Sequence, residues 1–307
     1  MAVVYSRQVR KAALLAVFTA CVLILAKGIA WWRTGSVSML ASITDSMLDL
    51  LASFMNMLIL RFALMPADHN HSFGHGKAES LAALVQSAFI SGSAIFLLLQ
   101  GVHRLNAPQP LQDTALGIGV TVLAIVMTLM LLLYQGKVIR QTDSPAIKAD
   151  RLHYRTDLLM NLAILLSLFL SLFGFIHADA FFAILIAFYI LFSAVKMLFE
   201  AVQLLLDRAL PEVEEALIAR TILSDKRVLG FHDLRTRRSG AVRFIQFHLE
   251  LDDHLSFLQA HEITDSVEQR LQQLFSQVDI VIHHEPTSVV IAEGNSEKQA
   301  QKPPIKI

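Results

Sequence analysis

The sequence of 307 residues is 54% hydrophobic and 17% charged, with a mean hydropathy of +0.53. Soluble globular domains are about 45–50% apolar and about a quarter charged, so this composition argues against a purely soluble enzyme. The formal net charge is zero, from 26 basic and 26 acidic residues, and lacks the basic excess that is typical of nucleic-acid-binding proteins. The single cysteine, Cys21, excludes a disulfide framework and a thiolate-rich metal cage.

The charges are distributed unevenly along the chain. Residues 1–206 carry 14 Lys/Arg and 10 Asp/Glu, a net of +4, whereas residues 207–307 carry 12 and 16, a net of −4. We therefore predict a membrane-spanning domain over residues 1–206 and a water-soluble domain over residues 207–290. Residues 291–307 are polar and are predicted to form a disordered tail.

Six apolar stretches in the first part are long enough for the about 20 helical residues that cross a bilayer. They lie over residues 12–32, 39–64, 79–101, 114–135, 147–172 and 178–205. Eight Lys/Arg residues flank the spans on the N-terminal side of the membrane and two on the other side, which predicts cytoplasmic termini. Lys27, inside the first span, is expected to snorkel toward the interface at Trp32.

Two pairs of ionisable residues interrupt these spans. Asp45 and Asp49 are four apart in the second span, and His153 and Asp157 are four apart in the fifth, so each pair shares a helix face. A carboxylate at the bilayer centre costs about 2.5–3.5 kcal/mol, and such residues are usually functional. The competing interpretation is that His153 and Asp157 lie in headgroup water at a helix end.

If the two faces meet, three carboxylates and one imidazole form a set of four ligands. That set suits tetrahedral zinc, and it would also accept ferrous iron, manganese or cadmium. Because protons compete with metal for the same ligand atoms, such a site favours the exchange of metal for protons.

The two helical pairs, with the segment PADHNHSFGHGKAE over residues 66–79, resemble the cation diffusion facilitator family, especially its bacterial zinc and ferrous-iron efflux branch. The resemblance extends from the first span to about residue 290. It implies a homodimer of the bacterial inner membrane that exports divalent metal by proton antiport with alternating access, and not an enzyme.

A second cluster lies in the loop between the second and third spans. Asp68, His71 and His75 fall within eight residues, but a solvated polar loop explains such a tract as well as a metal site does. The resemblance implies a metal site at these three residues, and the role of His69 is left open.

The resemblance also implies a brace between Lys77, at the start of the third span, and Asp207, after the sixth, that holds the dimer together. Interfacial anchoring is the alternative role for Lys77.

The soluble part predicts a small α+β domain. Its expected elements are a helix over 211–224, strands over 228–236 and 241–251, a helix over 255–276 and a strand over 278–284. The resemblance implies a ferredoxin-like fold for this domain.

Strand alternation places His248 on the face of its strand opposite Ile245 and Phe247, and it separates His283 and Glu285 from His284. Scattered histidines are most often surface residues. The resemblance nevertheless implies a cytoplasmic site that binds zinc, and the residues it assigns to that site are His232, His248, His261, His283 and Glu285.

Four functions could use such a pattern of residues. Proton-coupled export explains why ionisable groups lie on helix faces inside the membrane. A metal uptake channel is the second candidate, and it predicts a metal flux that does not respond to a pH gradient. An intramembrane metalloenzyme is disfavoured because the chain contains no H-E-x-x-H motif. A metal sensor would not need ionised groups inside the bilayer. The expected partners of the exporter are a second copy of the chain, divalent metal ions, protons and membrane lipid, with no nucleic acid.

Overall fold

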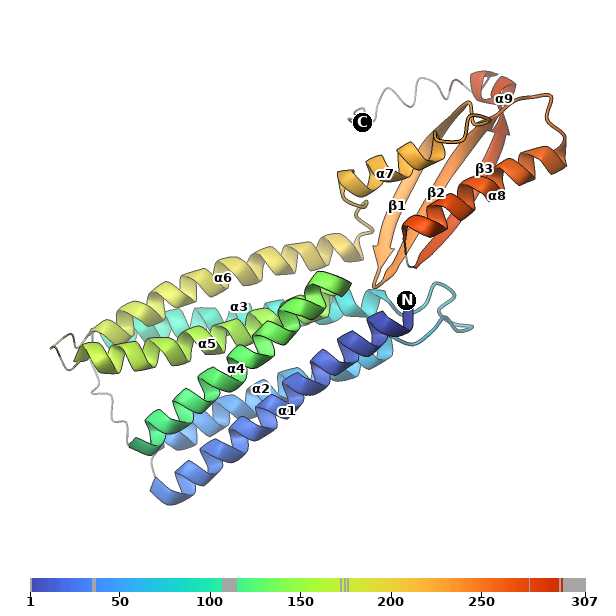
Figure 1. Cartoon of the computed structure of the whole chain (residues 1–307). Helices are drawn as coiled ribbons and strands as arrows, with labels where there is room; N and C mark the ends of the chain where they lie inside the picture. The colour runs from blue at the N-terminus through green and yellow to red at the C-terminus, as the bar shows by residue number, and fades with distance from the viewer. Residues whose placement is uncertain are drawn as a thin grey trace. The chain divides into compact units, whose positions relative to one another are not determined.

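The computed structural model describes residues 2–34, 37–106, 115–171, 173, 175, 177–275, 277–292 and 294 (Figure 1). The chain divides into two compact units, one over residues 3–202 and the other over residues 203–307. The first unit is helical and the second contains a β-sheet, so the predicted fold class, a helical domain followed by a small α+β domain, is confirmed.

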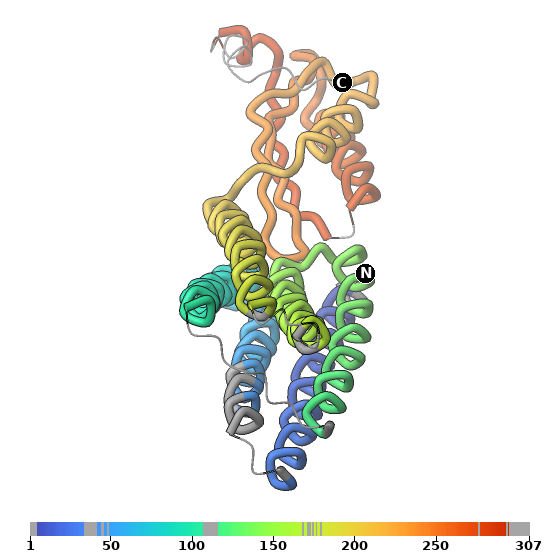
Figure 2. Tube along the Cα trace, turned by 90° about the vertical axis from the view of Figure 1, so that its left-hand side faces the viewer, coloured from blue at the N-terminus to red at the C-terminus, as the bar shows by residue number. Residues whose placement is uncertain are grey.

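Six long helices form the first unit within the described residues, and Figure 2 shows them running side by side. They are α1 Ala2–Thr34, α2 Val37–Ala63, α3 Lys77–Asn106, α4 Ala115–Thr142, α5 Pro145–Ser171 and α6 Ala178–Leu205. By length and composition, α1, α3, α4 and α6 contain segments apolar enough to cross a membrane. The two remaining helices, α2 and α5, carry the ionisable pairs, and each includes side chains that fall outside the described set.

Small residues form the contacts between these helices, while large apolar residues point outward. Ala12, Ala146 and Ala194 are completely buried, whereas Phe96 and Phe192 are largely exposed. This distribution is typical of membrane helices, because small side chains let backbones approach and lipid solvates the large ones. The helix pairs in close contact include α2 with α3 and α5, and α5 with α3 and α4.

The second unit has the predicted order of elements, α-β-β-α-β, followed by a short helix that was not predicted. Its elements are α7 Glu212–Ile222, β1 Gly230–Ser239, β2 Val242–Leu251, α8 Phe257–Leu274, β3 Val278–Pro286 and α9 Thr287–Ala292. The predicted tail therefore starts two residues too early, because residues 291 and 292 are helical. Residues 293 and 295–307 lie outside the described residues.

The three strands lie in the order β1-β2-β3, with β1 antiparallel and β3 parallel to β2. Ile218 of α7 and Val267 of α8 join Ile245, Phe247 and Leu249 of β2 in one buried core. Because strand residues alternate between faces, this core leaves the other face of the sheet to the intervening polar residues.

Asp225, just after α7, is an ion-pair centre of this unit. Its buried carboxylate pairs with Arg227 at 2.7 Å and with Arg270 of α8 at 3.2 Å. Hydrogen bonds from the Arg227 side chain are the largest cause that holds the pKa of Asp225 well below its usual range. The charged carboxylate thus ties the end of α7 to α8 at neutral pH.

Candidate metal centres

The first candidate centre joins α2 to α5 inside the helical unit. His153 Nε2 lies 3.2 Å from Asp49 Oδ1 and 3.8 Å from Asp157 Oδ2. One ligand atom from each residue lies within 4.8 Å of the other two. Metal–ligand bonds of about 2.0–2.1 Å in a tetrahedron place ligand atoms about 3.3 Å apart, so a small inward movement would let the three donors share one ion.

The surroundings of His153 suit its side chain to bind a metal ion. Its side chain is nearly buried, and Nε2 makes no hydrogen bond of good geometry within the described residues, despite its closeness to two carboxylates. A buried polar atom without a hydrogen bond is costly, so the arrangement favours an ion between the donors.

Tyr154 fixes the rotation of α5 that presents His153 to α2. Its hydroxyl donates to the carbonyl oxygen of Ala16 in α1 at 2.9 Å, and it lies 2.9 Å from the hydroxyl of Ser53 in α2. Because the single phenolic proton goes to Ala16, the Ser53 hydroxyl donates to the tyrosine oxygen. These bonds tie α5 to α1 and α2 beside the metal ligands.

Asp45, the fourth predicted ligand, lies in α2 one turn before Asp49. Its side chain falls outside the described residues, so its place in the cluster stays a prediction.

Lys27 corrects one expectation. The side chain does not snorkel to the Trp32 end of α1, because Nζ donates to Ser46 Oγ at 2.6 Å and to the Ser42 carbonyl at 3.2 Å. It lines one cavity of about 630 Å³ together with Asp49, and His153 and Asp157 line the same cavity. A resident positive charge therefore accompanies the ligand set.

Asp150, one turn before His153, was not singled out from the sequence. Its carboxylate is fully buried and accepts hydrogen bonds from Gln135 at 2.7 Å and from Gln86 at 3.4 Å. The spacing of three to His153 was visible in the sequence, but the charged residues around Asp150 made it resemble a solvated helix end.

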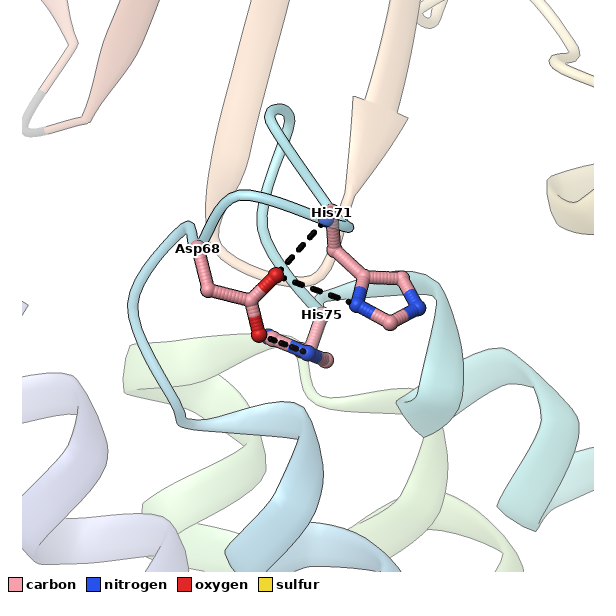
Figure 3. A group of neighbouring side chains, drawn as sticks. All are labelled: Asp68, His71 and His75. Carbon is pink, nitrogen blue, oxygen red and sulfur yellow. Dashed lines mark hydrogen bonds and ion pairs between the residues drawn. The ribbon is translucent and has the colours of Figure 1, made fainter.

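The second candidate centre is the loop after α2, drawn in Figure 3. Asp68 Oδ1 lies 3.2 Å from His71 Nδ1, and Asp68 Oδ2 lies 3.4 Å from His75 Nε2. The other ring nitrogen of His75 lies 3.2 Å from the Pro66 carbonyl oxygen, a contact that orients Nε2 toward Asp68. The structure thus brings together the three predicted loop residues.

The backbone keeps Asp68 in its charged form. The N–H groups of His71 and Asn70 donate to Asp68 Oδ1 at 2.7 and 2.9 Å. The bond from His71 is the largest cause that lowers the pKa of Asp68 below its ordinary value. The carboxylate is therefore ready to bind a cation at neutral pH.

The third candidate centre lies on the polar face of the sheet. His232 of β1, His248 of β2 and Glu285 of β3 each offer a ligand atom within 4.8 Å of the others. Glu285 Oε1 lies 2.9 Å from His248 Nδ1, and Oε2 lies 3.3 Å from His232 Nε2. His232 Nε2 and Glu285 Oε2 are buried and have no hydrogen-bond partner among the described residues, so these donors fit a divalent metal. The ring of His283 meets that of His248 edge to face, with the ring centroids 4.7 Å apart.

A β-bulge puts His232 on this face. The register between β1 and β2 shifts between His232 and Arg235, and Asp233 in the bulge has φ of 51°. His232 is paired with His248, whereas Leu234, two residues later, is in the core. The extra residue therefore lets one strand serve the metal face and the core in turn.

Glu250 was missed as a supporting residue. Its Oε1 lies 2.9 Å from Nδ1 of His232, the carboxylate–histidine arrangement that fixes which ring nitrogen faces a metal. Strand alternation puts Glu250 on the same face of β2 as His248. No sequence signal showed that β1 would bring His232 next to it.

Gly230 makes room for that carboxylate, because a Cβ at this position would lie 2.5 Å from Glu250 Oε2. We expect Gly230→Ala to displace the flexible Glu250 side chain and to weaken metal binding at the sheet site about tenfold, as loss of a supporting carboxylate does. Zinc titration of the full-length protein measures the change. Gly119→Ala is the matched control, since its Cβ would meet no atom within 4 Å. Equal affinity in both variants would contradict this role of Glu250.

The remaining predicted residues lie apart from these groups. His261 is exposed on α8, where Nε2 pairs with Asp265 Oδ2 at 3.5 Å, and the structure does not bring it to the sheet cluster among the described residues. A helix surface cannot be placed relative to a sheet face by strand alternation alone. Asp207 Oδ1 lies 3.4 Å from Arg237 Nη1 of β1, so its carboxylate has a partner inside the second unit.

Comparisons with known families identify both units. A model described as "Cation efflux transmembrane domain" matches residues 13–206, and one described as "Cation efflux protein, cytoplasmic domain" matches residues 210–287. The chain belongs to the cation diffusion facilitator family. Cation efflux is therefore its activity, and the chain is an integral membrane protein with metal ions as its partners.

The chain is similar to curated proteins of this family. "Cation-efflux pump FieF" of Yersinia enterocolitica is 54% identical over 292 residues, which are 95% of this chain and 97% of the relative. The protein of the same name from Yersinia pestis (strain Pestoides F) gives the same values. A solved structure, "Metal-bound C-terminal domain of CzcD transporter from Thermotoga maritima", is 27% identical to this chain, with a TM-score of 0.24. The match covers 25% of this chain and 95% of that structure.

Proposed function

We propose that this cation diffusion facilitator exports divalent metal across the bacterial inner membrane by proton antiport with alternating access. Zinc and ferrous iron are the expected cargo, with cadmium or manganese as further candidates. The observation that carries the proposal is the cluster of Asp49, His153 and Asp157, in which ligand atoms from two helices lie within 4.8 Å of one another beside a cavity.

Charge balance explains why such a site would exchange ions. With Asp45 included, three carboxylates and a neutral imidazole carry about −3, which a divalent metal reduces to about −1. Without metal, protons neutralise the same atoms, so that metal and protons displace each other. Metal would bind from the cytoplasm and leave after the site opens outward and protons return.

Export needs this coupling. Moving a dication outward against 100 mV, inside negative, costs about 4.6 kcal/mol, and each entering proton returns about 2.3 kcal/mol plus its pH term. An uptake channel would run inward instead.

The donor set also predicts selectivity. We expect protein in liposomes that contain a metal-sensitive dye to carry Zn²⁺, Fe²⁺ and Cd²⁺ but not Ca²⁺, because an imidazole and few oxygens suit borderline metals and not a hard cation that takes six to eight oxygens. Liposomes without protein give the background. Absence of flux for every metal, or equal flux of Ca²⁺ and Zn²⁺, would overturn the proposal.

The sheet and loop centres are proposed to hold regulatory or structural zinc. The sheet centre combines His232, His248 and Glu285 with the adjacent His283. His261 lies apart from this cluster within the chain, and we propose that it joins the site across the dimer interface. The loop centre is Asp68, His71 and His75. The cytoplasmic position of both, and of the two termini, follows from the eight-to-two distribution of basic residues.

We further propose a homodimer in which Lys77 and Asp207 form the brace. Lys77→Ala should raise the dimer dissociation constant at least severalfold and lower transport, whereas Lys77→Arg should preserve both, since it keeps the charge. Analytical ultracentrifugation in detergent and the liposome assay check the two effects. If Lys77→Ala changes neither the dimer equilibrium nor the flux, the brace is wrong.

A further inference from the structure

Arg151 and Arg155 place two positive charges one turn apart on α5, inside the helical unit. Among the described residues, neither guanidinium has a carboxylate within ion-pair distance or a hydrogen bond. The charges that act most strongly on Arg151 are those of Arg155 and Arg140, and both repel it. Arg151 Nε is buried without a partner. Charged side chains within membrane segments normally have a partner of opposite charge, so we expect these two arginines to bind an anion.

Space for Arg151 is built into α4. A Cβ at Gly136 would lie 3.0 Å from Arg151 Nη2, so the glycine lets the guanidinium lie close against that helix. The guanidinium of Arg151 therefore packs against α4, with its Nε buried.

The two arginines line a cavity of about 630 Å³ between α4, α5 and α6. Its remaining lining is aliphatic apart from one tyrosine, and consists of Leu129, Leu132, Leu133, Leu158, Leu159, Leu185, Ile186 and Tyr189. Such a cleft has a positively charged end and a long apolar wall, which are complementary to the headgroup and the acyl chain of an anionic phospholipid.

The depths of these residues match a lipid molecule. At about 1.5 Å per helical residue, Arg151 and Arg155 lie about 9 and 15 Å from the start of α5, and Leu159 lies about 21 Å from it. Helical side chains lean toward the N-terminus, so the arginines reach back toward the Pro145 end, on the headgroup side of the apolar wall. The apolar wall continues deeper into the membrane.

We propose that the cleft between α4, α5 and α6 binds one anionic phospholipid per protomer, with its phosphate on Arg151 and Arg155 and one acyl chain along the leucines. The lipid belongs to the leaflet at the Pro145 end of α5, which is the anionic cytoplasmic leaflet in the orientation proposed above. A soluble phosphate would satisfy the arginines but would leave the apolar wall unused, so lipid is the better ligand.

Native mass spectrometry of the full-length protein in mild detergent tests this site. With added phosphatidylglycerol, the wild type should retain one lipid per protomer, and the double variant Arg151→Met, Arg155→Met should bind it at least tenfold more weakly. Methionine keeps the aliphatic stems but removes the charges. Arg33→Met, at the other end of the bundle, is the control and should bind as the wild type does.

Two further arms separate the possible ligands. Leu158→Trp keeps both arginines and fills the cleft, so this variant should also lose the lipid. In a separate competition experiment on the wild type, phosphatidylcholine or millimolar inorganic phosphate should not displace phosphatidylglycerol. Full retention by the double variant, an equal loss in Arg33→Met, or displacement by inorganic phosphate would overturn the proposal. Thermal unfolding confirms that each variant is folded. The assay contains no metal gradient, so its outcome is independent of whether the transport proposal holds.

Discussion

Asp157→Asn is expected to abolish metal transport in liposomes while the protein stays folded. Asparagine has the size of aspartate, but it lacks the negative charge and the basic oxygen that a divalent metal needs. Asp157 Oδ2 lies 3.8 Å from His153 Nε2, so its loss removes one of the donors that surround the site. We expect zinc flux to fall more than about 100-fold, beyond the 10–100-fold effects of supporting residues. Asp49→Asn should behave alike.

The matched control is Asp143→Asn, the same substitution at the turn before α5, where the carboxylate pairs with Lys148 and is exposed. Surface ion pairs contribute about 0–1 kcal/mol, so this variant should transport zinc at a rate close to that of the wild type. Wild-type flux in both Asp49→Asn and Asp157→Asn would remove the ligand cluster from the mechanism.

His232→Ala is expected to remove at least one bound zinc per protomer from the full-length protein. His232 Nε2 is buried and faces Glu285, and its ring is fixed by Glu250, so alanine deletes the donor at the centre of the sheet cluster. Bound zinc counted by elemental analysis after dialysis measures the loss. Ligand binding stabilises a fold by about 2.7 kcal/mol at 100 times Kd, so the zinc-dependent rise in unfolding temperature should shrink as well.

Two variants sharpen this test. Glu285→Gln keeps the shape of the side chain and removes its charge, so we expect zinc to bind to it more weakly than to the wild type. His254→Ala is the control, because His254 is exposed and lies outside the cluster among the described residues. Wild-type zinc content in His232→Ala would show that the sheet cluster is not a metal site.

The sequence predicted those features that depend on local periodicity. The six helices follow from apolar length, and the His248 and Glu285 faces follow from strand alternation. The loop triad followed from the resemblance, since its residues alone fit a solvated loop equally well. The pairing of Asp49 with His153 and Asp157 could be predicted because the polar faces of two membrane helices turn away from lipid and toward each other.

Features that depend on the packing of one element against another could not be predicted from the sequence. The bulge at Asp233, which puts His232 opposite His248, depends on strand pairing that no single strand encodes. The position of Lys27 along the first span predicts a side chain that reaches the interface. The sequence does not show that Ser46 of α2 lies close enough to accept its hydrogen bond. His261 lies on a helix whose rotation against the sheet only packing determines.

Coupling of metal to protons is the central claim, and one measurement tests it directly. The wild-type protein is reconstituted with equal zinc on both sides, the membrane potential is clamped at zero, and the lumen is made one pH unit more acidic than the outside. Protons leaving the lumen each release about 1.4 kcal/mol, so antiport should drive net zinc accumulation inside, and reversing the pH gradient should reverse the movement. A zinc concentration that stays equal on both sides, in vesicles that still carry zinc down a zinc gradient, would contradict antiport.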